Sequence, residues 1–309
     1  VAFRMYFSGF LAFMYKRRIT NECAVGIDAR SAEWGRLAST LRLKGDNMIA
    51  GDFSNFDGTI EHSLFMGVLE IINDWYADSA ENKLVRKVLW SNIHHSKHLL
   101  NTYVYQLAHG QPSGNPATAI TNSMYNSLAI RYCYFRATGR PDFNRKCAVI
   151  TYGDDHIISV SQDVCDLFNP KVLTQHFSEL GMVYTSEDKG EQTEAFRPLS
   201  QVSFLKRGFA LCPETGYMMA PLALTSILEM TNWVSTTHGA QDAIRMNCID
   251  ACEELLFHPQ ATYTEYTDKI THALSARQLN IPTIDWKFGR QLIASGRLYL
   301  IREAERPRV

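Results

Sequence analysis

A chain of 309 residues with 46% hydrophobic and 20% charged side chains can bury the cores of two or three domains, which excludes a disordered or low-complexity protein. Its 31 basic and 32 acidic residues give a net charge of −1, so no protein-wide positive field attracts polyanions. A nucleic acid would therefore have to be held by local basic clusters, for which the candidates are Lys16 to Arg18, Arg42 with Lys44, and Lys206 with Arg207.

Cysteine and histidine spacing gives no sign of a zinc motif. The seven cysteines contain no C-x-x-C pair, which predicts reduced thiols. Among His94, His95 and His98, two imidazoles lie one helical turn apart, but no glutamate completes the H-E-x-x-H pattern, so we expect a polar surface run there. The apolar stretch from Met5 to Tyr15 is too short to span a bilayer, and its charges follow it. We expect a soluble protein that is cut from a precursor or is part of a longer one.

The first quarter of the chain predicts two helices, a strand and a third helix. Helices are expected over residues 1–20 and 32–43, and a buried strand over 47–53 leads to Asp52. A long helix follows Asp57, which could simply cap that helix. Asp52 is harder to explain in this way, because an acid that ends an apolar strand needs a partner or an ion.

A polar loop then precedes another long helix. Residues 83–110 predict a helix and a His-rich, strand-like section, followed by the Ser113-Gly114 loop. Asn115 as N-cap and Pro116 as first helical residue predict a helix that continues to about Arg136. On it, a polar stripe with four-residue spacing faces either water or a site; its members are Thr118, Asn122 and Asn126.

Two β-prone runs flank Gly153-Asp154-Asp155 and predict a hairpin over residues 148–158. Its tip carries two adjacent carboxylates, which are hard ligands suited to Mg²⁺ or Mn²⁺, although an exposed acidic turn is the simpler alternative. If the strand that ends at Asp52 lies beside this hairpin, three acids converge. A pair of divalent cations would then relieve their repulsion.

The remainder changes character near residue 210. Asn169-Pro170 and Gly181 bound a predicted helix, residues 182–185 a strand, and Lys189 lies in the loop after it. Residues 201–212 have the pattern of a strand-rich segment, whereas the chain after Pro221 has helical spacing. The four helices are expected over residues 223–236, 241–257, 261–279 and 288–303.

Four segments in this order carry a family resemblance: D-F-S-N-F-D at 52–57, S-G-N-P-A-T-A-I-T-N at 113–122, Y-G-D-D at 152–155 and F-L-K-R at 204–207. Together they resemble the RNA-dependent RNA polymerases of positive-strand RNA viruses in the picornavirus-like group, and F-S-N-F-D is similar to the insect dicistrovirus form. The resemblance implies an α+β right-hand polymerase: a palm of antiparallel sheet with packed helices and an RRM-like core, an α-helical thumb, and most of the fingers missing. The implied division is palm at 1–88 with a remnant of the fingers, fingers insertion at 89–110, palm again at 111–210, and thumb at 211–309.

The resemblance also implies roles for individual residues in template-directed transfer of a nucleotide from a ribonucleoside triphosphate to an RNA 3′-end. Metal ligands for Mg²⁺, which Mn²⁺ can replace, would be Asp52, the Phe53 carbonyl, Asp154 and the less essential Asp155. Lys189 would be the general acid, although from spacing alone it is as readily a solvated loop lysine. The ribose would contact Asp57, Ser113, Thr118 and Asn122, with Gly114 in a flexible loop, and the primer would contact Lys206 and Arg207.

The implied partners are an RNA template and primer, ribonucleoside triphosphates and other viral replication proteins, in replication complexes of the host cytoplasm. Two alternatives stay open. A reverse transcriptase shares the palm, but Asp57 with Asn122 favours recognition of the ribose 2′-hydroxyl. A catalytically inert RNA-binding fragment is the other, because the family's basic fingers motif that grips the triphosphate does not precede Val1.

Overall fold

The computed structural model describes residues 1–186, 195–213, 215–233 and 240–297. The chain forms two compact units, one of residues 1–27 and 39–205, the other of residues 28–38 and 206–309. The predicted change of character near residue 210 lies close to the passage from the first unit to the second. Among the described residues, no helix combines the length and apolar character needed to cross a bilayer.

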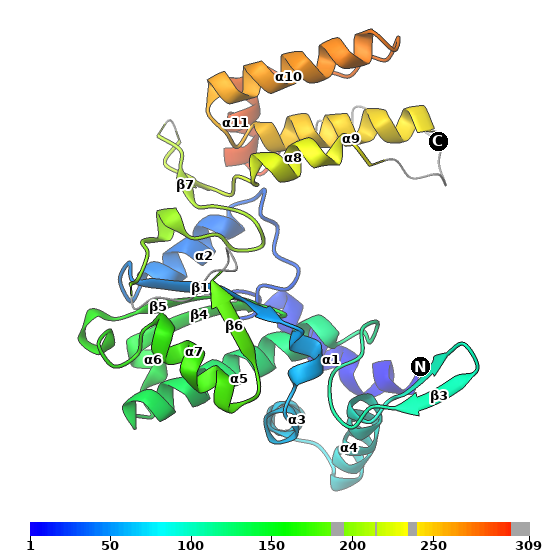
Figure 1. Cartoon of the computed structure of the whole chain (residues 1–309), viewed down its shortest axis with the longest axis vertical. Helices are drawn as coiled ribbons and strands as arrows, with labels where there is room; N and C mark the ends of the chain where they lie inside the picture. Colours follow the sequence, from blue (N-terminus) through cyan, green and yellow to red (C-terminus); the bar gives the residue numbers. More distant parts are fainter. Residues whose placement is uncertain (187–194, 214, 234–239, 298–309) are drawn as a thin grey trace. The chain divides into compact units, whose positions relative to one another are not determined.

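The first unit is built around a four-stranded antiparallel sheet with strand order β4-β5-β1-β6 (Figure 1). As predicted, β4 and β5 form a hairpin, in which Tyr152 pairs with Asp155. Its two-residue turn places Gly153 at a φ of 64°, a conformation that glycine adopts without strain. The strand bounds are β1 Met48–Ser54, β4 Cys147–Tyr152, β5 Asp155–Val160 and β6 Val183–Ser186.

Helices cover the sheet and enclose an aromatic core. The long helix α5 packs on β4 and on α7, and α7 also contacts β6 (Figure 1). Phe53 of β1 meets Phe177 of α7 edge-on at 4.9 Å between ring centroids, and its ring also contacts Tyr184. The helices of this unit are α1 Ala2–Lys16, α3 His62–Tyr76, α4 Ala80–His94, α5 Thr118–Thr138, α6 Phe143–Lys146 and α7 Pro170–Glu179, with short 3₁₀ turns η1 Phe56–Thr59, η2 Gln162–Val164 and η3 Leu199–Gln201.

An exposed hairpin of β2 (Lys97–Leu100) and β3 (Tyr103–Gln106) follows α4 and extends away from the sheet (Figure 1). The expected polar surface run of histidines is wrong for His94, which is 1% exposed. The cause is helical geometry, because His94 continues the buried side of α4 that Arg86 and Trp90 begin, and its ring stacks on Phe65 of α3 at 4.9 Å.

Three local predictions need correction. Asp57 does not cap α3, because it lies in η1; the cap is Glu61, whose carboxylate accepts a hydrogen bond from the Leu64 N–H at 3.0 Å. The helix α5 begins at Thr118, two residues after Pro116. Residues 201–212 contain little strand, because left-handed backbone at Leu205 and Lys206 interrupts it. Only β7 (Ala210–Leu211) is present there, paired with β8 (Met218–Met219).

The second unit is helical after Pro221, as predicted, and has its own apolar core. The described parts of the predicted helices form α8 Leu224–Met230, α9 Ala240–Leu255, α10 Gln260–Ser275 and α11 Trp286–Ala294; the predicted portions within 234–239 and 298–309 lie outside the described residues. Helix α2 (Glu33–Arg42) begins in this unit and ends in the first. The mixed sheet-and-helix first unit and the helical second unit agree with the α+β class.

Candidate active site

Two neighbouring strands bring the acids together. Strand β1 pairs antiparallel with β5, so that Gly51 lies opposite His156, and Asp52 follows at the end of the shared ladder. The predicted adjacency of the Asp52 strand and the Gly153-Asp154-Asp155 hairpin is therefore confirmed. Burial raises the pKa of the Asp154 carboxyl, and the negative charges of Asp52 and Asp57 raise it further. The negative charges of Asp52 and Asp57 therefore repel the ionised carboxylate of Asp154.

A cleft of about 560 Å³ is lined by Asp57 and Asp154, and by Phe53, which follows Asp52 in the chain. It is lined by the segment after β1, the start of α5 and the hairpin turn. The described residues that line it include Asp57, Thr118, Asn122, Gly153 and Asp154. The polar stripe of α5 therefore faces a site rather than bulk water.

Asp57 is held in place by contacts to two segments. The Asn122 Nδ2 donates to Asp57 Oδ1 at 2.6 Å, and the Gln111 N–H donates to the Asp57 carbonyl at 2.9 Å. The Gln111 side chain donates in turn to Thr118 Oγ1 at 3.3 Å. Close approach at this point requires glycine at 110, because a Cβ there would stand 2.9 Å from the Asp57 carbonyl oxygen and its φ is 109°.

Two side chains of helix α5 also hold the turn of the β4–β5 hairpin in place. The Gly153 N–H donates to Ser123 Oγ at 2.7 Å, while Asn126 Nδ2 donates to the carbonyls of Gly153 at 3.1 Å and Asp154 at 2.8 Å. Both side chains are fully buried. The sequence does not predict this role for Ser123, because its only distinguishing feature there is its position beside Asn122. Asn126 was seen in the stripe but not assigned to the site.

The other predicted residues differ in their relation to the cleft. Phe53 lies in β1 with its ring in the core and is among the residues that line the cleft, whereas Asp155 is half-buried at the start of β5. Ser113 and Gly114 lie in an exposed loop, and the described residues that line the cleft do not include them. Lys189 lies outside the described residues.

The two predicted primer-binding residues belong to the second unit. Lys206 is exposed. Arg207 is only partly exposed, and its guanidinium donates to both carboxylate oxygens of Glu254, at 2.7 and 2.9 Å, and to the Ala220 carbonyl at 2.9 Å. The charged side chains of Lys206 and Arg207 therefore have different surroundings, although the two residues are neighbours in the chain.

The donor set of the cleft fits a divalent cation of the magnesium type. Carboxylate oxygens from Asp52 and Asp154 are hard ligands, and their mutual repulsion with Asp57 is the kind that a bound cation relieves. Asp155 stands next in sequence and could add an oxygen.

Comparison with known proteins decides the family. A family model described as viral RNA-dependent RNA polymerase matches residues 1–278. The chain belongs to the viral RNA-dependent RNA polymerase family. It is 34% identical over 287 residues to the replicase polyprotein of Acute bee paralysis virus and 35% identical over 299 residues to that of Drosophila C virus, covering 88% and 91% of this chain. The predicted similarity to picorna-like insect viruses is thereby confirmed.

The chain spans only 15% and 17% of the lengths of these two polyproteins. Among solved structures, the polymerase fold of a Sicinivirus 3Dpol RNA-dependent RNA polymerase superposes with a TM-score of 0.80 at 21% identity, covering 96% of this chain and 60% of that one. This likeness confirms the predicted right-hand polymerase fold.

Proposed function

We propose that this chain forms the catalytic part of a polymerase that transfers nucleotides from ribonucleoside triphosphates to an RNA 3′-end during viral genome replication. The observation that carries the proposal is the grouping of Asp57 and Asp154 on one cleft, with Asn122 bound to Asp57 and with Asp52 near enough for its charge to raise the pKa of Asp154. In this assignment residues 1–88 and 111–210 are palm, 89–110 a fingers insertion and 211–309 the thumb.

In the proposed mechanism Asp52 and Asp154 hold Mg²⁺, for which Mn²⁺ can substitute, with Asp155 and the Phe53 carbonyl as further ligands. Two such ions, held by these residues, would supply Lewis-acid assistance to the attacking 3′-hydroxyl and charge neutralisation for the leaving pyrophosphate. Lys189 donates a proton to that pyrophosphate. The fixed turn at Gly153 keeps the Asp154 carboxylate in place, so little reorganisation accompanies the reaction.

Substrate choice rests on Asp57. Its Oδ1 already accepts the Asn122 amide, which leaves the second carboxylate oxygen to accept from a ribose 2′-hydroxyl. Thr118 supports the start of α5, and Ser113 with Gly114 forms the adjacent loop. This arrangement favours ribose and argues against a reverse transcriptase, which must exclude the 2′-hydroxyl.

The template and primer are the RNA partners of this site, and Lys206 and Arg207 bind the primer strand. Other viral replication proteins are further partners, and the place of action is the replication complex in the host cytoplasm. The replicase polyproteins to which the chain is similar support this setting.

The test is Asp154→Asn in the polymerase that carries this chain. Primer extension with Mg²⁺ should be lost, while RNA binding measured by filter retention stays close to wild type, because only a metal ligand has changed. Asp163→Asn is the matched control, since Asp163 is an exposed acid that pairs with Lys146. Primer extension by Asp154→Asn at the wild-type rate would contradict the proposal.

A further inference from the structure

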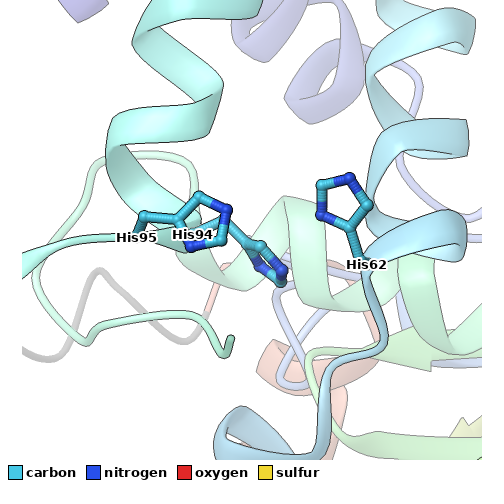
Figure 2. A group of neighbouring side chains, drawn as sticks. All are labelled: His62, His94 and His95. Carbon is cyan, nitrogen blue, oxygen red and sulfur yellow. The ribbon is translucent and has the colours of Figure 1, made fainter. Parts of the chain in front are cut away.

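Three histidines from two helices meet away from the cleft. His62 is the first residue of α3, His94 is the last residue of α4, and His95 is the C-cap that follows it. One ring nitrogen of each lies within 4.8 Å of a ring nitrogen of the others, and Figure 2 shows the three side chains around a common space. The described residues that line the catalytic cleft include none of them.

His94 is the unusual member of this group. It is 1% exposed, and neither ring nitrogen makes a hydrogen bond of normal geometry among the described residues, although the Gly110 backbone is close enough to raise the pKa of the ring. Burying a polar nitrogen without a partner costs about 1–3 kcal/mol, so packing on Phe65 alone is a poor explanation for a histidine here. Something that accepts a nitrogen lone pair would remove this cost.

The electrostatic surroundings of His94 are those of a buried, crowded ring. Burial lowers the pKa of His94 to about 4, and His62, His95 and His109 act in the same direction, while a hydrogen bond with the Gly110 backbone raises it. The position at the carboxyl end of α4 adds the negative end of the helix dipole, and the Glu61 carboxylate lies next to His62.

We propose that His62, His94 and His95 bind one Zn²⁺ ion, with water in the fourth position. Three imidazoles are nitrogen ligands that suit zinc, whereas Mg²⁺ prefers oxygen. Zinc–nitrogen bonds of about 2.0–2.1 Å require the nitrogens to come closer than they are. His62 and His95 are exposed and can rotate inward onto the fixed ring of His94.

Three imidazoles and a water leave one coordination position open, unlike the four protein ligands of a purely structural zinc site, but here the bound ion would act by joining two segments of the chain. It ties the end of α4, and with it the β2–β3 hairpin, to the start of α3, which begins five residues after Asp57. The chain leaving that hairpin contacts the Asp57 carbonyl through the Gln111 N–H. Zinc therefore restrains the insertion beside the proposed ribose-binding residue without touching the reacting groups.

The experiment measures Zn²⁺ binding by the purified protein after chelator treatment, using a chromophoric competitor and excess Mg²⁺ to occupy carboxylate sites. We expect one Zn²⁺ per chain and a rise in the thermal midpoint when Zn²⁺ is added. His62→Ala and His95→Ala should each weaken binding by more than about 100-fold, beyond the loss typical of outer-sphere partners. Both side chains are exposed, so these variants should keep the fold, which circular dichroism checks.

Two controls separate this site from others. His98→Ala changes a neighbouring histidine whose Nε2 lies 2.8 Å from Ser96 Oγ, and it should bind Zn²⁺ like wild type. Asp154→Asn should also retain the site, which keeps this result independent of the proposed polymerase activity. Absence of bound Zn²⁺ in the wild-type protein, or equal affinity in the His62 and His95 variants, overturns the proposal.

Discussion

Within the described residues, the Asp57 carboxylate is held by the side chain of Asn122. The Asn122 amide donates to its carboxylate at 2.6 Å, and hydrogen bonds to charged groups contribute about 1.5–3 kcal/mol. Asn122→Ala should therefore let Asp57 turn and lower the preference for ribo- over deoxyribonucleotides by about tenfold or more. Competing incorporation of the two triphosphates measures this preference. The exposed α4 residue Asn92, changed to Ala, serves as control, and an undiminished preference in Asn122→Ala contradicts the role given to Asp57.

The ionisation of Asp154, a proposed metal ligand, affects the stability of the fold. Its pKa is raised in the fold by burial and by Asp52 and Asp57, so the fold favours the protonated carboxyl. Stability is therefore present at low pH and is lost as the pH rises from the unfolded pKa through the higher folded pKa. At neutral pH without metal the ionised carboxylate destabilises the protein.

Asp154→Asn should consequently raise the melting temperature at pH 7 in the presence of a chelator. The same variant should lose most of the further rise that Mg²⁺ gives to the wild type, because a ligand has gone. Melting curves with chelator and with Mg²⁺ measure both effects. A variant less stable than wild type in chelator would mean that the carboxylate is not under repulsive strain.

At the level of elements, strand β1 depends on a glycine just before Asp52. A Cβ at Gly51 would stand 2.3 Å from the Tyr184 ring and 2.4 Å from the Thr185 carbonyl oxygen, so β6 would have to move. Gly51→Ala should destabilise the protein by about 1–3 kcal/mol, the usual cost of overpacking. Gly67→Ala in α3 is the control: its nearest neighbour would be Leu128 Cδ1 at 3.7 Å, and alanine should stabilise the helix by up to about 1 kcal/mol. Urea unfolding of both variants tests the contrast, and equal stability changes would contradict it.

The elements that sequence reasoning placed well are those with local signals. The β4–β5 hairpin follows from its Gly turn, and α7 from Asn169, whose Oδ1 accepts the Val172 N–H at 3.0 Å. Adjacency of β1 and β5 could be stated only as a condition, because pairing of strands a hundred residues apart leaves no local trace. The resemblance of four sequence segments to the polymerase family is what indicated that these two strands lie side by side.

The errors arise where tertiary contacts override local preference. Asp57 resembled a helix cap, but its carboxylate is bound by Asn122 and the cap passes to Glu61. Ser123 holds the hairpin turn, yet a buried serine in a helix has no distinctive spacing. His62 lies 32 residues before His94, so the three-histidine group forms only when α3 and α4 pack together. Such relations become visible only in three dimensions.

Across the whole molecule, the second unit is assembled from distant parts of the chain. Residues 28–38 join residues 206–309, and Arg30 connects the two through Glu253 at 2.8 Å and Glu254 at 2.6 Å. Arg207 binds the same Glu254 carboxylate, which is only 1% exposed. Arg207 therefore has a structural contact in addition to its proposed primer-binding role, whereas Lys206 is exposed. Of the pair, Lys206 is the better placed for an RNA phosphate.

Glu254 is the acid on which this unit should depend. Burial alone would raise its pKa, but the hydrogen bond from Arg207 and the charges of Arg30 and Arg207 outweigh that effect and lower it. A lowered carboxyl pKa contributes stability above the unfolded value, and this stability is lost as the pH falls through the folded pKa. Glu254→Ala should cost about 3–5 kcal/mol at pH 7, because two guanidinium groups lose a buried partner.

The effect should diminish as the pH falls below about 4.5, the ordinary value for glutamate, because the unfolded chain then takes up a proton at this position, and it should be lost once the pH passes the lower pKa of folded Glu254. Hydrogen exchange of α9 amides at neutral and acidic pH measures the loss within this unit. Glu265→Ala on α10 is the matched control, because its pairing with Lys269 is exposed and solvent screens it. If Glu254→Ala and Glu265→Ala exchange alike at pH 7, the ion pairs of Arg30 and Arg207 do not hold residues 28–38 to the helical unit, and apolar packing must do so instead.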